Sequence, residues 1–575
     1  MTDPAATPLR RRAVPAPGQA PLPAPNAAAL LRRNASDPAT RDRPAVWFED
    51  RVWTHAEYVA ESRRWANLLL DRLPEGRPRH VAVLLDNRPE YLFAFGGAAF
   101  AGAAVVGLNH TRRGEHLLRD ARHTDCGLVV TEPKHLELLE PVLDQLPPVL
   151  VVGEGLEDAL AAYDDGDPGL EPSVDTPWGL IFTSGTSDAP KAVICSQRRL
   201  MVTGNRMGII MDLGPDDIGY VCMPLFHSNA VQVGWAPSLV YGCSVGLARR
   251  FSASRWLADV RHYGATYFNY TGKPLAYLLA QPERPDDADN PLRVAFGNEG
   301  SPEVVDAFSR RFGVDVIDAY GATEGGVAVN RDVEERAGAL GRAGEGVKVV
   351  DDDGNEKPRA RFDEHGRLTN AEACVGEIVN TGGAGPFEGY YNNPEATART
   401  TRFGWYWSGD LGYLDDDGYL YFAGRNADWI RVDGENFPAG PIEEALRHHP
   451  DVVLATVYGV PDDQAGDQVM AGLVLRDGAS FDPAGFAAWV DGLPDVGPKW
   501  RPRYVRLLGD PPTTGTNKIV KRTLVHQKWR RDRVGGDPVF VRLRGETAYR
   551  PFAPDDEDAL AASFVHYRRE QFWDL

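Results

Sequence analysis

A short run of small hydroxyl residues closed by a lysine is the clearest candidate for chemistry in this sequence. The run contains, in order, Thr183, Ser184, Gly185, Thr186, Pro190 and Lys191. Backbone N–H groups of such a loop can surround phosphate oxygens, hydroxyls can donate to them, and a lysine adds positive charge. The spacing differs from a Walker P-loop, because Ala192 follows Lys191 directly. A loop that binds nothing is the alternative for this composition alone.

Polar residues also stand directly after three other apolar segments. His227 follows residues 218–225, while Asn298 and Glu299 follow residues 292–296. The segment 314–318 leads into a longer polar run that contains Asp318, Ala319, Tyr320, Gly321, Thr323 and Glu324. Ligands of open α/β sheets bind beyond the carboxyl ends of strands, so we expect these residues to meet the hydroxyl loop at one site. Taken alone, each polar run can instead be a structural turn, and His227 can instead be a histidine of the core.

Short apolar runs alternate with segments of helical periodicity through the first part of the chain. Residues 80–85 suit a strand buried on both faces, and residues 91–108 are expected to form one buried core helix rather than a membrane span. The alternation predicts an α/β fold whose large N-terminal domain contains doubly wound sheets. Residues 338–421 have short segments between Gly and Asp turns, which predicts a β-rich subdomain. A small, mobile α+β C-terminal domain is expected to follow.

Domain boundaries are expected where the composition changes. Residues 1–25 are rich in Pro and Ala and predict a disordered tail. Residues 26–424 then form the N-terminal domain, and residues 425–575 form the C-terminal domain together with a charged, aromatic extension. With 575 residues, the chain is too long for a single core.

Net charge and cysteine usage limit the partners and the compartment. The formal charge of −20 argues against nucleic acid as a partner, and any anionic ligand must be held by local basic groups. The 5 cysteines are odd in number and widely spaced, which predicts free thiols in a reducing cytoplasm. The N-terminal region has no apolar segment of a signal peptide, and we expect no integral membrane segment.

Five motifs, in chain order, resemble those of the adenylate-forming superfamily, which includes acyl-CoA synthetases, peptide-synthetase adenylation domains and luciferases. Residues 183–191 are similar to the pattern Thr-Ser-Gly-Thr-Thr-Gly-x-Pro-Lys, and residues 320–324 match Tyr-Gly-x-Thr-Glu. Residues 408–410 read Ser-Gly-Asp, residues 424–431 resemble the hinge between two domains, and residues 513–518 read Thr-Thr-Gly-Thr-Asn-Lys. The last motif is most similar to the very-long-chain acyl-CoA synthetase and fatty acid transport protein branch.

The resemblance implies a nucleotide site built from these motifs. It implies that the ATP phosphates are bound by Thr183, Ser184, Gly185, Thr186, Lys191 and Thr323. It implies that the adenine and ribose are bound by Asn298, Glu299, Asp318, Ala319, Tyr320, Gly321, Asp410 and Arg425. The Tyr320 ring can stack on a base, and the Asp410 carboxylate has two oxygens that can accept hydrogen bonds from the ribose hydroxyls.

The resemblance also implies the catalytic groups and the reaction. Glu324 and Thr186 would hold Mg²⁺, Lys518 would stabilise charge at the α-phosphate, and His227 would lie between nucleotide and acid. A carboxylic acid would attack ATP to give acyl-AMP and pyrophosphate. The C-terminal lid domain would then rotate about the hinge near Ala427, and CoA would displace AMP. The family's pantetheine-tunnel loop corresponds to residues 433–436.

Two residues depart from the family pattern. Asp188 stands where the family has Gly in the phosphate loop, and Ala427 stands at the usual Asp or Lys pivot. A carboxylate ~4 Å from a phosphate charge costs about 1 kcal/mol in water-like surroundings and ~4 kcal/mol at an effective dielectric near 20. We expect Asp188 to point into solvent, so that activity is retained.

Other functions stay open at the level of sequence. The chain can be an adenylating enzyme with another acceptor, such as a nitrite-activating aryl amine diazotase or a carrier-protein loader. It can also be a catalytically weak protein that binds nucleotide or acyl groups. The acid itself is not determined, although its pocket is expected near Val231, Trp235, Tyr270 and Gly300. The oligomeric state, monomer or homodimer, is also left open.

Overall fold

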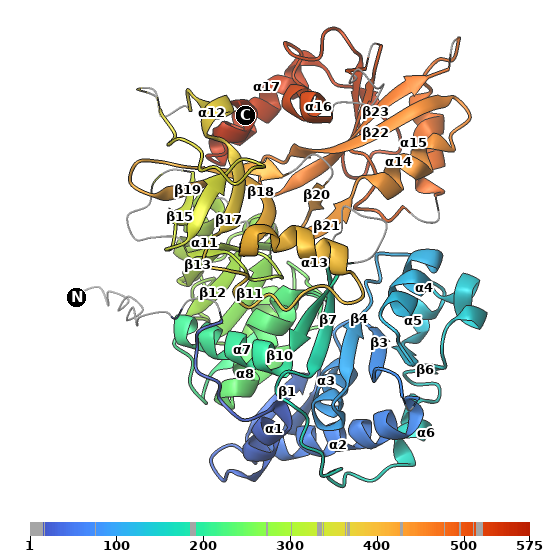
Figure 1. The fold of residues 1–575 in the computed structure, drawn as a ribbon, viewed down its shortest axis with the longest axis vertical. Coiled ribbons are helices and arrows are strands. Elements are labelled where there is room, and N and C mark those ends of the chain that lie inside the picture. The colour runs from blue at the N-terminus through green and yellow to red at the C-terminus, as the bar shows by residue number, and fades with distance from the viewer. Residues whose placement is uncertain are drawn as a thin grey trace.

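The computed structural model describes most of the chain (Figure 1). The described residues are 15, 18–74, 76–183, 191–271, 274–298, 300, 302–330, 336, 338–362, 364, 368–425, 429–476, 478–493, 496–509, 511–512 and 521–574. Among them, no helix is both long and apolar enough to cross a membrane.

A six-stranded sheet begins the N-terminal part and carries the hydroxyl loop. Its order is β6 (Val149–Val151), β5 (Leu128–Thr131), β3 (His80–Leu84), β4 (Ala104–Gly107), β7 (Pro177–Thr183) and β8 (Lys191–Ser196). All neighbours are parallel except β7 and β8, which form an antiparallel hairpin with Thr183 opposite Lys191. The hairpin therefore fixes both ends of the loop that was expected to bind phosphate.

An eight-stranded sheet carries the other polar runs. Its order is β14 (Ala328–Asn330), β13 (Asp315–Gly321), β12 (Val294–Asn298), β11 (Tyr267–Thr271), β9 (Ile218–Val221), β10 (Ser244–Leu247), β1 (Pro44–Phe48) and β2 (Arg51–Thr54). The six central strands are parallel, and both edge strands are antiparallel. The carboxyl ends of β12 and β13 thus lie at one edge, as the sequence predicted.

Helices surround these two sheets and bury a shared core. They include α1 (Ala27–Ser36), α2 (His55–Arg72), α3 (Pro89–Ala101), α4 (Gly114–His123), α5 (Pro133–Leu136), α6 (Leu156–Ala161), α7 (Gln197–Met211), α8 (Ala236–Tyr241), α9 (Trp256–Tyr263), α10 (Pro274–Leu279) and α11 (Pro302–Phe312). Helix α2 begins with a capping box, in which Thr54 and Glu57 satisfy each other's backbone N–H groups. Helix α3 is buried on all sides, which explains its apolar composition.

The prediction of one helix over residues 91–108 is wrong. Helix α3 ends at Ala101, and Gly102 adopts a left-handed conformation with φ +62°. Residues 104–107 then form strand β4 in the six-stranded sheet. The left-handed glycine ends the helix, and the β-branched Val105 and Val106 favour the buried strand that follows. A single apolar run therefore forms two core elements.

A third sheet corresponds to the predicted β-rich subdomain. It has the antiparallel order β15 (Ala339–Arg342), β19 (Tyr419–Arg425), β18 (Tyr406–Leu414), β17 (Gly376–Asn380) and β16 (Val347–Val350), and it lies beside α13 (Pro394–Thr400). Its strands are coloured yellow and orange between the two larger parts of the molecule (Figure 1). The sheet brings Asp410, on β18, toward the carboxyl end of β13.

The C-terminal part has its own hydrophobic cores around residues 430–573. A hairpin of β20 (Trp429–Val432) and β21 (Glu435–Pro438) comes first. A five-stranded sheet follows, formed by β22 (Val452–Pro461), β23 (Asp467–Leu475), β24 (Tyr504–Leu507), β25 (Val539–Val541) and β26 (Arg550–Pro551). The helices are α14 (Gly440–Arg447), α15 (Pro483–Asp491), α16 (Lys521–Gln527), α17 (Pro554–His566) and α18 (Glu570–Asp574).

The charged, aromatic extension is part of this unit, because β25 and β26 complete its sheet. The mixed architecture confirms the predicted fold class of an α/β N-terminal part, a β-rich subdomain and an α+β C-terminal part. The division at 424/425 stays a prediction.

Candidate active site

A cavity of about 510 Å³ lies where the two large sheets, the β-rich sheet and the C-terminal hairpin meet. The predicted residues that line it are Thr183, Lys191, His227, Asn298, Ala319, Tyr320, Gly321, Thr323, Glu324 and Asp410. They come from segments that are far apart in the chain. Within the described part of the chain, the polar residues at the strand ends therefore lie in one cavity with the two residues that flank the loop.

Glu324 is held in the cavity wall by two hydroxyl groups. Thr183 Oγ1 donates to Glu324 Oε1 at 3.1 Å, and the Tyr390 hydroxyl donates to the same oxygen at 2.7 Å. No hydrogen bond from a described residue reaches Oε2. The side chain is 9% exposed. The second oxygen of this buried, oriented carboxylate can bind a cation or accept a hydrogen bond from a ligand.

Lys191 lies over the ring of the same tyrosine. Its Nζ is 5.3 Å from the centre of the Tyr390 ring, a cation–π arrangement. Burial lowers the pKa of Lys191, and the negative charge of Glu324 acts in the opposite direction. Tyr390 thus connects the lysine that closes the loop to the carboxylate at the end of β13. No sequence motif pointed to this tyrosine, which lies in an irregular segment before α13.

Tyr320 and Asp410 meet across the boundary between two sheets. The Tyr320 hydroxyl donates to Asp410 Oδ2 at 2.6 Å. Asp410 lines the cavity and is only 5% exposed, so its carboxylate is largely shielded from bulk solvent. An aromatic ring beside a carboxylate offers a flat face and paired acceptor oxygens, which suit a base and a sugar diol respectively.

Asp318 and Asn298 occupy neighbouring strand ends. The Tyr270 hydroxyl and the Gly300 N–H both donate to Asp318 Oδ2, at 2.7 Å and 2.9 Å. Asn298 Oδ1 is buried and accepts no hydrogen bond from the described residues. A buried amide oxygen without a donor is costly, so this atom indicates a position where a bound ligand can supply an N–H or O–H group.

His227 also lines the cavity and is uncharged at neutral pH. Burial lowers its pKa to about 4, although the Glu435 carboxylate acts to raise it. At neutral pH the imidazole is therefore uncharged and can accept or donate a hydrogen bond. Gly434 and Glu435 of the C-terminal hairpin also line the cavity. The resemblance indicated this hairpin only through residues 433–436.

Several predicted residues fall outside the described part of the chain. They are Ser184, Gly185, Thr186, Glu299 and Lys518, together with the departures Asp188 and Ala427. Arg425 ends β19, where its backbone pairs with that of Asp410.

The location of the acid pocket stays a prediction. Val231, Trp235 and Tyr270 are buried in the core, and none of them, nor Gly300, lines the cavity. Their neighbours in the sequence, Gln232, Val233 and Thr271, do line it, and helix α7 adds Arg199, Thr203, Arg206 and Met207.

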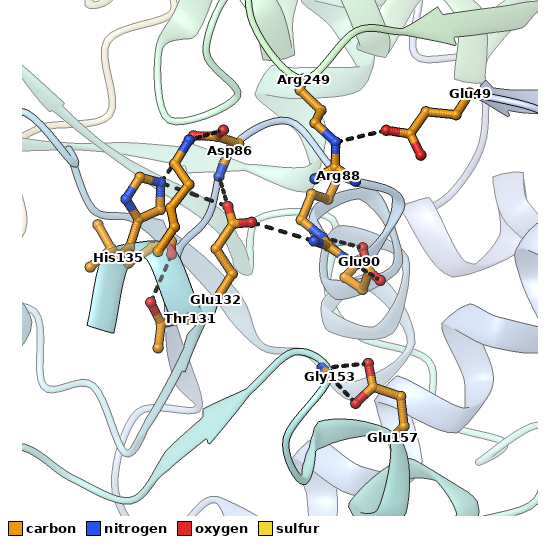
Figure 2. A network of polar contacts seen from close by, with 12 residues as sticks. Glu49, Asp86, Arg88, Glu90, Thr131, Glu132, His135, Gly153, Glu157 and Arg249 are labelled. Atoms are coloured by element: carbon orange, nitrogen blue, oxygen red, sulfur yellow. Dashed lines mark hydrogen bonds and ion pairs between the residues drawn. The ribbon is translucent and has the colours of Figure 1, made fainter. Parts of the chain in front are cut away.

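A second polar cluster lies beyond the ends of β3 and β5 (Figure 2). One ligand-type atom from each of Asp86, His110 and His135 lies within 4.8 Å of the others. However, Lys134 forms an ion pair with Asp86, and His135 Nε2 lies 2.9 Å from Asp86 Oδ1. Burial would raise the pKa of Asp86, but hydrogen bonds from His135 and Lys134 together hold it below its ordinary value.

The two imidazoles of this cluster are stacked rather than convergent. Their ring centres are 5.0 Å apart and their planes differ by 8°. An ion must lie close to the plane of each ring that binds it, and two stacked parallel planes do not share such a point. Glu132 accepts from the Asp86 N–H at 2.7 Å and from Arg88 at 3.3 Å (Figure 2). The cluster is therefore a satisfied polar network that orders the strand ends.

Comparisons with known proteins identify the family. The AMP-binding enzyme family matches residues 31–391, and the AMP-binding enzyme C-terminal domain matches residues 441–518. The chain belongs to the AMP-binding enzyme family. Its first matched region includes most of the residues that line the cavity. The resemblance to the adenylate-forming superfamily is thereby confirmed.

Relatives of this AMP-binding enzyme are similar along most of their length. A steroid-22-oyl-CoA synthetase of Rhodococcus jostii (strain RHA1) is 46% identical over 539 residues, which cover 92% of this chain and 96% of the relative. The medium/long-chain-fatty-acid–CoA ligase FadD17 of Mycobacterium tuberculosis (strain ATCC 25618 / H37Rv) is 47% identical over 485 residues, which cover 84% and 93%.

A solved structure shares the fold. A double mutant of the o-succinylbenzoate CoA synthetase of Bacillus subtilis is similar with a TM-score of 0.72 and 24% identity, and the match covers 86% of this chain and 97% of that one.

Proposed function

We propose that this AMP-binding enzyme is an AMP-forming acid–CoA ligase, which activates a carboxylic acid with ATP and transfers the acyl group to CoA. The observation that carries the proposal is the cavity, in which Thr183, Lys191 and Glu324 come together with Tyr320 and Asp410. Thr183 and Lys191 suit phosphate, Glu324 suits a cation, Tyr320 suits a base, and Asp410 suits the hydroxyls of a ribose. The family match and the CoA ligases among its relatives support the same reaction.

The nucleotide would extend across the carboxyl ends of β12 and β13. Tyr320 stacks on adenine, Asn298 and Asp318 bind its polar edge, and Asp410 accepts from the ribose hydroxyls. The unused acceptor of Asn298 Oδ1 supports this arrangement, because adenine carries an amino group that can donate to it. Ala319 and Gly321 are small enough to let the nucleotide approach the backbone. We assign Arg425 to the ribose side, because its backbone lies opposite that of Asp410 in the β18–β19 pair.

The phosphates would lie between the β7–β8 hairpin and Glu324. Thr183, Ser184, Gly185, Thr186, Lys191 and Thr323 donate to phosphate oxygens. A Mg²⁺ ion fits here, because it prefers one or two carboxylates together with phosphate oxygens and water. Glu324 offers its unused Oε2 for that purpose, and Thr186 is assigned as the second protein ligand. The ion would neutralise phosphate charge, while Lys518 would stabilise charge at the α-phosphate.

The thiol of CoA would reach the acyl group past the C-terminal hairpin. Glu435 and Gly434 border the cavity beside His227, and the neutral imidazole presents no charge to an acyl group. We assign His227 to this junction between acid, nucleotide and thiol. The C-terminal lid domain would rotate about residues 425–431 between the two steps, which is a domain-closure device.

The acid would be bulky or long, since the relatives are a steroid-22-oyl-CoA synthetase and a medium/long-chain-fatty-acid–CoA ligase. Placement in the very-long-chain branch stays a prediction, as does a cytoplasmic location.

The testing experiment measures pyrophosphate release from ATP with steroid-22-oic acids and with fatty acids, each with and without CoA. We expect release that needs one of these acids, and a CoA thioester as the product. Pyrophosphate release with nitrite and an aryl amine, without any dependence on CoA, would contradict the proposal. Lys518→Ala provides the matched control, because it should slow acyl-AMP formation far more than transfer from a supplied acyl-AMP to CoA.

A further inference from the structure

Helix α7 presents two buried arginines to the cavity. Arg199 and Arg206 are 4% and 8% exposed, and both line the cavity together with Thr203 and Met207. The two arginines are seven residues apart, which places them on the same face of a helix, about 10 Å apart along its axis. Guanidinium groups are seldom buried unless a carboxylate pairs with them.

Arg199 belongs to the catalytic end of the cavity. Its Nη1 donates to the Ile194 carbonyl at 2.8 Å, and its Nη2 donates to the Thr323 carbonyl. Thr323 immediately precedes Glu324, so this arginine supports the turn that carries the central carboxylate. Its guanidinium is thus committed to the backbone of the site.

Arg206 lies two helical turns farther along α7 and is differently placed. Its Nε–H donates to the Pro15 carbonyl at 2.8 Å, and no carboxylate of the described residues pairs with it. Burial lowers its pKa to about 10, so the guanidinium stays charged at neutral pH. A buried cation with unused donors is unfavourable by itself, and an oxygen acceptor in the cavity would relieve this cost.

The cavity wall around Arg206 is only partly apolar. Gln232 and Thr203 line the cavity together with Met207, Val233 and Phe296. A purely hydrocarbon chain would leave the donors of Arg206 without a partner. A molecule with a polar far end would satisfy them, while its middle contacts the apolar side chains of this wall.

We propose that Arg206 binds an oxygen acceptor, a ketone or a second carboxylate, at the end of the acid that is remote from the carboxyl group being activated. This inference rests on the proposed function and names a substrate class for it. The acid would have an apolar body and a polar far end. Arg206 would then select such acids over plain monocarboxylic acids of the same length.

A purely structural role for Arg206 makes a different prediction. The same helix holds the N-terminal segment through a second contact, since Asn205 Nδ2 donates to the Pro21 carbonyl at 2.8 Å. Gly18 of that segment also lines the cavity. If Arg206 only anchors this segment, then Asn205→Ala should have the same effect as a change at Arg206.

The experiment compares decanoate, decanedioate and an oxodecanoate whose ketone adjoins the terminal methyl group. Pyrophosphate release gives kcat/KM for each acid, and calorimetry gives the Kd of each acid without turnover. We expect Arg206→Met to lower kcat/KM for the two acids with a polar far end by about ten- to a hundredfold, the usual range for a hydrogen bond to a charged group. Decanoate should be unchanged or improved, and Asn205→Ala should preserve the selectivity.

The outcomes separate the two proposals. Equal losses for all three acids, or the same selectivity change in Asn205→Ala, would overturn the role of Arg206 in selection. A loss for decanedioate alone would assign the far end to a carboxylate, and equal losses for both polar acids would assign it to any oxygen acceptor. If wild type binds the polar acids through Arg206 but releases no pyrophosphate, the proposed function fails while this inference stands.

Discussion

Thr111 Oγ1 donates a hydrogen bond to Glu435 Oε2 at 3.1 Å, and this contact joins the N-terminal part of the chain to the C-terminal hairpin. Glu435 is 5% exposed, and Lys499 Nζ lies 2.8 Å from its other oxygen. Burial would raise the pKa of Glu435, but the Lys499 ammonium and the hydrogen bond from Thr111 hold it below its ordinary value. The hairpin is therefore fixed beside the cavity by an ionised carboxylate that is fully paired.

We expect Thr111→Val to slow acyl transfer to CoA while acyl-AMP formation is preserved. The substitution removes the donor at nearly constant volume and leaves a buried carboxylate one hydrogen bond short, which costs about 1–3 kcal/mol in this arrangement. Pyrophosphate release without CoA reports the first step, and thioester formation from a supplied acyl-AMP reports the second. A roughly tenfold loss confined to the second step is the expected result.

Thr111→Ser is the matched control, because it retains the hydroxyl group. It should behave like wild type in both steps. Equal slowing of both steps by Thr111→Val would show that the contact supports the cavity generally rather than one domain arrangement.

Tyr390→Phe tests how Glu324 is oriented. The ring remains for Lys191, but one of the two hydrogen bonds to Glu324 Oε1 is lost. We expect acyl-AMP formation to fall by about tenfold to a hundredfold, in line with ~1.5–3 kcal/mol for a hydrogen bond to a charged group. Glu324→Gln should cost more, because it removes the charge itself. A Tyr390→Phe enzyme with an unchanged dependence on Mg²⁺ concentration and an unchanged rate would contradict this role.

Acid sensitivity of the fold should arise from histidines whose pKa is lowered by burial. Burial lowers the pKa of His55 to about 4, and its Nε2 lies 3.2 Å from the Gly242 carbonyl. Because the unfolded chain binds the proton near pH 6.5, this histidine stabilises the fold fully above that pH and loses the contribution as pH falls toward 4. The full loss is about 3 kcal/mol by proton linkage.

We expect His55→Gln, which can still donate to Gly242, to reduce the fall in unfolding free energy between about pH 6.5 and pH 4. Urea denaturation at several pH values in this window measures the difference. His110 and His227 have similarly lowered pKa values of about 4 and would contribute the remaining slope. If the unfolding free energy of His55→Gln depends on pH as strongly as that of wild type, then His55 does not contribute to the acid sensitivity.

Periodicity and chain order predicted the architecture well, because strands such as β3 and helices such as α2 are evident from local apolar patterns. The strand ends of β12 and β13 could likewise be placed at one edge by topology alone. The failure at residues 91–108 arose because hydropathy does not show where Gly102 turns the chain. Tyr390 and Arg206 were missed for another reason, since neither lies in a motif. Their roles depend on segments brought together from distant parts of the chain.

Lys528 provides a last prediction, on the docking of the C-terminal helices. It is 3% exposed, and its Nζ donates to the carbonyls of Phe572 and Trp573. Burial, with smaller contributions from Arg533 and Arg530, lowers its pKa to about 7. The unfolded chain keeps the proton up to about pH 10. Stability should therefore rise as pH increases from about 7 to about 10, by up to about 4 kcal/mol for this group.

Lys528→Met removes the titrating group and retains an unbranched side chain of similar length. Its stability should depend less on pH between about 7 and about 9 than that of wild type, as measured by urea denaturation of the full chain. Lys521→Met is a suitable control, because Lys521 is paired with Glu443 at 2.8 Å instead of with backbone carbonyls. An identical rise in stability for wild type and Lys528→Met would show that the buried ammonium stays protonated over this range, and that the C-terminal helices are held by their aromatic contacts with Trp529 instead.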